Sequence, residues 1–220
     1  MKKNNFYLLF FALILSVVMQ NQAIAEKGSV SKTEKIDVSE LDLQNGDLIF
    51  QSLGGKQGNA LKLALQSKIN HVGMVYIKDA EIFVIEAAAK VKLTPIKKYL
   101  KRNKGHFEVK RLKNAAKKLT KANWKKIVKE CEEHLDKPYD IYFNWDDDKF
   151  YCSELVWKIY NKCLGIKLGN LKKLKEFDLS HPLVKNLLKE RYGDNPPLDD
   201  SIISPDSMYD SKDLETVIKN

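Results

Sequence analysis

A cysteine placed where a polar loop becomes an amphipathic helix is the feature that most constrains this chain. The loop is Asn144–Lys149, and the apolar residues that follow Cys152 recur at helical spacing: Leu155, Val156, Ile159 and Tyr160. A thiol at a helix N-terminus lies near unpaired backbone N–H groups and the positive end of the macrodipole. Both lower the thiol pKa and favour the nucleophilic thiolate. The alternative is that Cys152 is a small buried apolar residue.

The first 25 residues have the pattern of a cleavable secretory signal peptide. Two lysines precede an apolar run of 14 residues, 6–19, and Ala23-Ile24-Ala25 forms a small-x-small cleavage site. The alternative, a membrane anchor, would need roughly 20 apolar residues. We therefore expect a bacterial protein that is periplasmic or secreted, with a signal peptide over 1–25 and one domain over 26–220.

The chain is basic, with a net charge of +9, and much of the excess lies between Lys97 and Lys126. That stretch holds 13 Lys or Arg residues against one acid, Glu108. A surface of this kind attracts polyanions. Export argues against nucleic acid, so the predicted partner is anionic lipid or an anionic wall polymer. The alternative is a solvated surface with no partner.

Three cysteines are an odd number for an exported protein. Cys152 and Cys163 fall about 16 Å apart on one predicted helix, at ~1.5 Å rise per residue, which is too far for a disulfide. Cys131 could pair with Cys163 and leave Cys152 free. Alternatively, all three thiols stay reduced and buried.

Hydrophobic periodicity and turn residues predict an alternation of strands and helices. Strands are expected over residues 48–50, 71–77, 82–88 and 107–112. Helices are expected over 59–67, from Thr94 with Pro95 to about 102, from Thr120 to the Lys137-Pro138 pair, and over 152–163, 171–177 and 182–191. Residues 54–58 and 195–207 are expected to be loops. The sequence has no metal-spaced His/Cys cluster and no glycine-rich phosphate loop, so we expect neither metal nor cofactor.

A thiol hydrolase needs a base beside the thiol and a third group that orients the base. Among the four histidines, His71 alone opens an apolar strand, and Glu86 is the one carboxylate in the apolar run of the next strand. An even number of loop residues in that hairpin would place His71 and Glu86 on one face; an odd number would place them on opposite faces unless a bulge intervenes. The alternative for Glu86 is a sheet-edge residue that reaches solvent or a lysine.

Several ordered motifs resemble the YiiX/YaeF group of permuted papain-like enzymes, relatives of the NlpC-type cell-wall hydrolases. They span the mature chain and comprise Gly46-Asp-Leu-Ile-Phe-Gln51, His71-Val-Gly-Met74, Ile85-Glu-Ala87, Lys137-Pro-Tyr-Asp140, Asp147-Asp148, Tyr151-Cys-Ser-Glu154 with Val156-Trp157, and Lys172-Lys-Leu-Lys-Glu-Phe-Asp-Leu179. The resemblance implies an α+β, circularly permuted papain-like fold with an antiparallel sheet packed on helices. It also implies Cys152 as nucleophile, His71 as base and Glu86 as its orienting residue.

The expected chemistry is acyl transfer through an acyl-enzyme. Candidate oxyanion or substrate residues are the Cys152 backbone N–H, Gln51 and Tyr151. Asp146–Asp148 either binds a basic substrate group or leads into the helix. The expected substrate is a peptide or acyl-containing small molecule of the cell envelope, cleaved at an amide. The alternatives are hydrolysis or transfer of lipid ester or acyl groups, and a non-catalytic envelope-binding protein.

Overall fold

The computed structural model describes residues 37–102 and 106–220, and these residues belong to one compact unit. The strands are β1 (Leu48–Gln51), β2 (His71–Lys78), β3 (Glu81–Ala87), β4 (Val91–Pro95), β5 (Glu108–Leu112), β6 (Lys172–Lys173), β7 (Ser201–Ile202) and β8 (Leu214–Lys219). The α-helices are α2 (Gly55–Leu65), α3 (Ile96–Leu100), α4 (Ala115–Lys118), α5 (Lys121–His134), α6 (Cys152–Leu164), α7 (Pro182–Tyr192) and α8 (Pro205–Tyr209). The structure also describes the 3₁₀ turns η1 (Val38–Glu40) and η3 (Leu174–Glu176).

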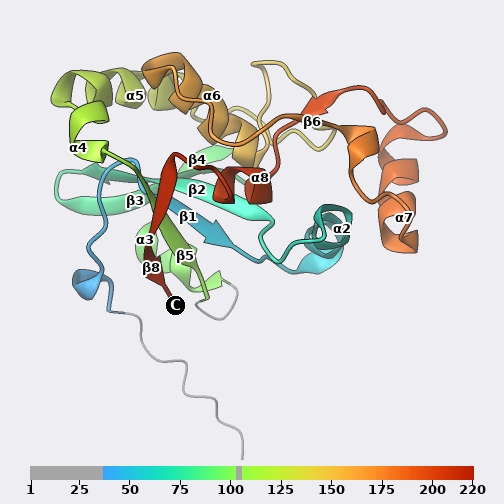
Figure 1. The fold of residues 1–220 in the computed structure, drawn as a ribbon, viewed down its shortest axis with the longest axis horizontal. Coiled ribbons are helices and arrows are strands. Elements are labelled where there is room, and N and C mark those ends of the chain that lie inside the picture. Colours follow the sequence, from blue (N-terminus) through green and yellow to red (C-terminus); the bar gives the residue numbers. More distant parts are fainter. Residues whose placement is uncertain (1–36, 103–105) are drawn as a thin grey trace, which may run out of the picture. The chain divides into compact units, whose positions relative to one another are not determined.

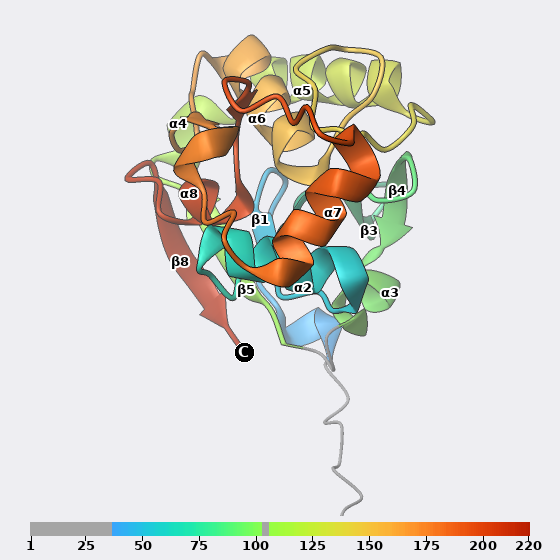
Figure 2. The same cartoon turned by 90° about the vertical axis from the view of Figure 1, so that its right-hand side faces the viewer.

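Six strands form one antiparallel sheet in the order β4-β3-β2-β1-β5-β8, and β6 pairs with β7 separately. One face of the sheet, with Met74 and Ile85, packs against α5 and α6. The other face, with Val75 and Val84, packs against α3. Helices therefore cover both faces (Figure 1), and this explains why β1 and most of β2 are buried throughout. Beside the sheet, α7 lies across α2 (Figure 2).

The hairpin between β2 and β3 places the predicted histidine and glutamate on one face. Its loop has two residues, Asp79 and Ala80, with φ of 51° and 63°. Positive φ at both central residues is typical of tight two-residue hairpin turns. Because the loop length is even and side chains alternate along a strand, His71 and Glu86 project to the same side.

Gly73 lies between them on that face and leaves room for a neighbouring ring. A Cβ atom at Gly73 would lie 2.5 Å from Cγ1 of Val84 and 3.1 Å from the Tyr99 hydroxyl. The Tyr99 ring packs against the His71 ring with centroids 5.9 Å apart. The glycine therefore permits the close packing of α3 that supports His71 from one side.

The structure differs from the sequence expectations in four segments. Helix α2 begins at Gly55, inside the expected loop, and residues 91–95 form strand β4 before a short helix. Residues 171–177 form β6 and a 3₁₀ turn, and residues 195–207 contain β7 and most of α8. At residues 91–95, the Thr94-Pro95 pair has the pattern of a helix start. Pairing of Thr94 with Val84 extends the sheet there instead.

Cys131, Cys152 and Cys163 are free thiols in this structure, and Cys131 and Cys152 are buried, as the alternative with reduced cysteines predicts. Cys163 differs from that alternative because it is only partly buried. The leader predicted over residues 1–25 lies outside the described residues. Within 37–102 and 106–220, no helix is both long enough and apolar enough to cross a membrane.

Candidate active site

Cys152 is the first residue of α6, as the sequence predicts. The start of this helix is fixed on both sides of the cysteine. The Tyr151 backbone N–H donates to the Glu154 carboxylate at 3.3 Å, and the Ser153 hydroxyl donates to the Ile203 carbonyl at 2.8 Å. The thiol is therefore held at the N-terminus of a helix with little conformational freedom.

His71 is the first residue of β2, and it links Cys152 to Glu86. Its Nε2 lies 2.7 Å from Oε2 of Glu86, which leaves Nδ1 for the thiol of Cys152. Burial alone would lower the pKa of His71, but hydrogen bonds with Cys152 and Glu86 outweigh burial and raise the pKa to about 9. The imidazole is therefore protonated at neutral pH.

The opposite shift occurs at the thiol. Burial would raise the pKa of Cys152, but the hydrogen bond and positive charge of His71 lower it, helped by the backbone N–H groups of Val72 and Ser153. Both shifts favour a thiolate–imidazolium pair, the form in which a cysteine is nucleophilic.

Glu86 is completely buried, and both of its oxygens are fully engaged. Arg102 donates two hydrogen bonds, one to each oxygen, both at 2.6 Å. The Thr94 hydroxyl donates to Oε1, also at 2.6 Å. Burial would raise the pKa of Glu86, but the bonds from His71, Arg102 and Thr94 hold it well below the usual range. These bonds favour the anionic form of Glu86 and fix the carboxylate beside the His71 ring.

Sequence reasoning missed Arg102 and Thr94, which complete this cluster. Arg102 lies among many lysines, and Thr94 has the appearance of a helix cap. Their shared role arises because β4 pairs with β3 and α3 then returns over Glu86. A usable signal was the buried carboxylate itself, since a charge in an apolar strand requires a nearby cation or several donors.

The two predicted oxyanion residues make other contacts in this structure. The Gln51 side-chain amide donates to the Tyr99 carbonyl at 3.2 Å. The Tyr151 hydroxyl accepts the Ile203 backbone N–H at 3.1 Å, while the Tyr151 ring lines a pocket beside Cys152. The roles proposed for Gln51 and Tyr151 stay predictions.

In the acidic loop before α6, the carboxylates of Asp146 and Asp147 bind nearby groups of the protein. The Asp146 carboxylate accepts backbone N–H groups from Asp148 and Lys149, at 2.9 and 3.2 Å. Asp147 forms an ion pair with Lys158 at 2.9 Å. These contacts favour the interpretation of Asp146–Asp148 as a lead-in to the helix.

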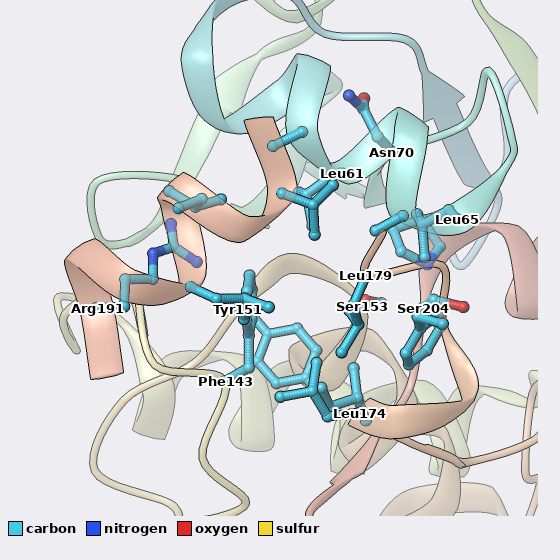
Figure 3. A pocket seen from close by; sticks show the side chains of 18 of the residues that line it. Leu61, Leu65, Asn70, Phe143, Tyr151, Ser153, Leu174, Leu179, Arg191 and Ser204 are labelled. Carbon is cyan, nitrogen blue, oxygen red and sulfur yellow. The ribbon is translucent and has the colours of Figure 1, made fainter. Parts of the chain in front are cut away.

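Cys152 lies where two cavities meet. The first, about 70 Å³, extends between α2, α7 and the segment after η3, and its walls are mainly leucine and aromatic side chains (Figure 3). The second is an open cleft of about 430 Å³ lined by His71, Arg102 and the small residues Ala87–Ala89. An apolar group and a polar group of one substrate could therefore flank the thiol.

Tyr139 is a further residue of the site, and it lines both cavities together with Cys152. The side-chain amide of Gln57 donates to the Tyr139 hydroxyl oxygen at 3.0 Å. The phenolic hydrogen is thus left to donate elsewhere. In the sequence Tyr139 is one residue of the Lys137–Asp140 motif, and its place between the cavities depends on the packing of α2.

Comparisons with known proteins show the family of this chain. A family model described as permuted papain-like amidase enzyme, YaeF/YiiX, C92 family, matches residues 42–218. The chain is 42% identical over 177 residues to the uncharacterized protein YiiX of Escherichia coli (strain K12), covering 80% of this chain and 86% of that protein. A crystal structure described as metalloprotein YiiX from Escherichia coli O157:H7 matches with a TM-score of 0.77 and 41% identity, covering 82% of this chain and 99% of that one.

Proposed function

Because this chain belongs to the YaeF/YiiX family of permuted papain-like amidases, we propose that it is an exported thiol hydrolase that cleaves an amide bond with Cys152, His71 and Glu86. The α+β permuted papain-like fold predicted from the sequence is confirmed by the same matches. The observation that carries the proposal is the bonded series from Arg102 through Glu86 and His71 to Cys152, which ends at a helix N-terminus.

The proposed reaction has two steps. The Cys152 thiolate attacks the amide carbonyl carbon, and the oxyanion accepts hydrogen bonds from backbone N–H groups at the start of α6. The tetrahedral intermediate collapses when His71 gives its proton to the leaving amine, which forms a thioester at Cys152. His71, now neutral, removes a proton from water. The resulting hydroxide attacks the thioester, releases the acid and restores the thiolate–imidazolium pair.

Two substrate classes fit the cavities. A peptide amide of the cell envelope is the first, because the open cleft offers polar groups beside His71. A lipid or acyl substrate is the second, and the apolar pocket at Cys152 favours it specifically. A non-catalytic binding protein would not require a Glu86 held by Arg102 and Thr94, so these bonds argue against that alternative.

The description of the solved relative as a metalloprotein raises the question of a metal at this site. Among residues 37–102 and 106–220, no group of three or more His, Cys, Asp or Glu side chains could hold a metal ion. At the site itself, both Glu86 oxygens are occupied, so only Cys152 and one ring nitrogen of His71 would be available as ligands. This donor set does not fit a protein-bound metal, and the steps above are assigned to side chains.

The basic stretch from Lys97 to Lys126 supports a secondary proposal, attraction to anionic lipid or wall polymer. Both of its arginines have structural partners: Arg102 binds Glu86, and Arg111 binds Asp47 at 2.8 Å. The lysines would supply the attraction, which should weaken with salt.

The test of the proposed function is turnover of muropeptides, N-acyl amides and phospholipids by purified protein, with intact-mass detection of a thioester. We expect an acylated intermediate at Cys152, no turnover by Cys152→Ala, and parental turnover by the matched control Cys163→Ala. The rate should fall as pH rises through about 9, because His71 then loses the proton that the leaving amine needs. Turnover retained by Cys152→Ala would contradict the proposal.

A further inference from the structure

Arg191, in the last turn of α7, is a half-buried cation in an apolar setting. It lines the apolar pocket beside Cys152, at one end of the group of side chains shown in Figure 3. Its guanidinium lies 5.0 Å from the centre of the Phe143 ring and donates to the Gln57 side-chain oxygen at 2.8 Å. Both of these partners are uncharged.

In the described part of the chain, no ion pair joins Arg191 to a carboxylate, unlike Arg102 and Arg111. Glu190 and Asp140 are near enough to favour the charged form of Arg191, but their hydrogen bonds are made with other groups. Glu190 pairs with Lys56, and the Asp140 carboxylate accepts the backbone N–H of Tyr142 at 2.8 Å. An anionic group that entered the pocket would form a charge-assisted hydrogen bond with this guanidinium, which is stronger than a bond to a neutral amide.

The charged residues around both cavities also favour binding of an anionic group. Among the described residues that line them there is no aspartate or glutamate, and the arginines are Arg102 and Arg191. Arg102 forms an ion pair with Glu86, whereas the side-chain hydrogen bond of Arg191 goes to the neutral amide of Gln57. Two hydrogen bonds connect Arg191 to the reaction centre, because Gln57 bonds both Arg191 and Tyr139, and Tyr139 lines the cavities with Cys152.

We propose that Arg191 is a specificity residue that binds a carboxylate or phosphate on the part of the substrate that enters the apolar pocket. This inference deepens the proposed function, since it makes the substrate an amphiphile with an apolar body and an anionic group. Guanidinium forks bind both kinds of oxyanion, and the experiment distinguishes the two.

The experiment measures binding to full-length Cys152→Ala protein by calorimetry, with three ligands of equal chain length: octanoate, octyl phosphate and neutral octanamide. We expect one or both anions to bind about tenfold or more tightly than octanamide, as a charged hydrogen bond would produce. A preference for octanoate identifies a carboxylate, and one for octyl phosphate identifies a phosphate ester. Because the variant lacks the nucleophile, the result is independent of whether the parent hydrolyses any amide.

Adding Arg191→Met should remove the preference for anions, while Arg191→Lys should keep part of it. The matched control is Lys189→Met, an exposed basic residue of the same helix that lines neither cavity. If Arg191→Met fails to fold, Arg191→Gln replaces it. An anion preference that survives in the folded variant, or no binding of any of the three ligands to the Cys152→Ala protein, would overturn the proposal.

Discussion

Glu86→Gln should lower turnover by about 10²–10⁴-fold, by analogy with the carboxylates of other triads. A neutral amide can hydrogen-bond the His71 ring in the wrong tautomer, and it stabilises imidazolium less. The change also leaves Arg102 without its counter-charge, so we expect lower thermal stability, in contrast to a plain sheet-edge glutamate, whose loss would cost within about 0.5 kcal/mol. Substrate binding should change little.

Two further variants separate the effects on rate and stability. Glu86→Gln combined with Arg102→Met removes both charges and should recover stability relative to Glu86→Gln alone, without restoring turnover. Thr94→Val removes one hydrogen bond of 2.6 Å to Glu86 and should have a smaller effect on rate. Parental turnover by Glu86→Gln, on a substrate that Cys152→Ala cannot process, would reduce the site to a Cys152–His71 dyad.

Arg102→Met should destabilise the protein by about 2–4 kcal/mol at neutral pH, because it leaves a buried carboxylate without its cation. The pKa of Glu86 should rise, since the bonds from Arg102 help to hold it low. A carboxylate with a depressed pKa stabilises the folded state above its unfolded pKa and loses that effect as pH falls. The stability difference between parent and variant should therefore be largest at neutral pH and shrink in acid.

The same variant should lose activity at a higher pH than the parent as the solution is acidified, because protonated Glu86 no longer supports the His71 imidazolium. Arg111→Met is the matched control: Arg111 also donates two hydrogen bonds to a buried carboxylate, Asp47, but lies outside both cavities. It should lower stability without moving the acid limb of the rate profile. Equal acid limbs in Arg102→Met and the parent would remove Arg102 from the positioning of His71.

Sequence reasoning located the candidate residues whose signals are local. Cys152 stands out because helical periodicity begins there, and His71 because it opens an apolar strand. Glu86 stands out as a carboxylate in that apolar hairpin, and the two-residue turn then fixes its face. Each inference needs only a short window of sequence and the periodicity of one element.

The side chains that contact those residues, and the cavities beside them, could not be predicted from short windows of sequence. The hydrogen bonds from Thr94 and Arg102 to Glu86 depend on the pairing of β4 with β3. The sequence does not suggest this pairing, because Thr94-Pro95 has the pattern of a helix start. Arg191 resembles an ordinary basic residue at a helix C-terminus until α7 is placed against α2. The cavities arise from segments distant in sequence, which no local pattern reports.

The pH dependence of Cys152 alkylation by iodoacetamide, followed residue by residue with mass spectrometry, tests most directly whether His71 stabilises a nucleophilic thiolate. Burial raises the pKa of Cys131 and Cys163, whereas His71 lowers that of Cys152. We predict that native Cys152 reacts faster than the other two and remains reactive below the usual thiol pKa of about 8.5. His71→Ala should slow the reaction and move its pH limb upward. Equal rates at all three cysteines, with the same limb in His71→Ala, would contradict the account.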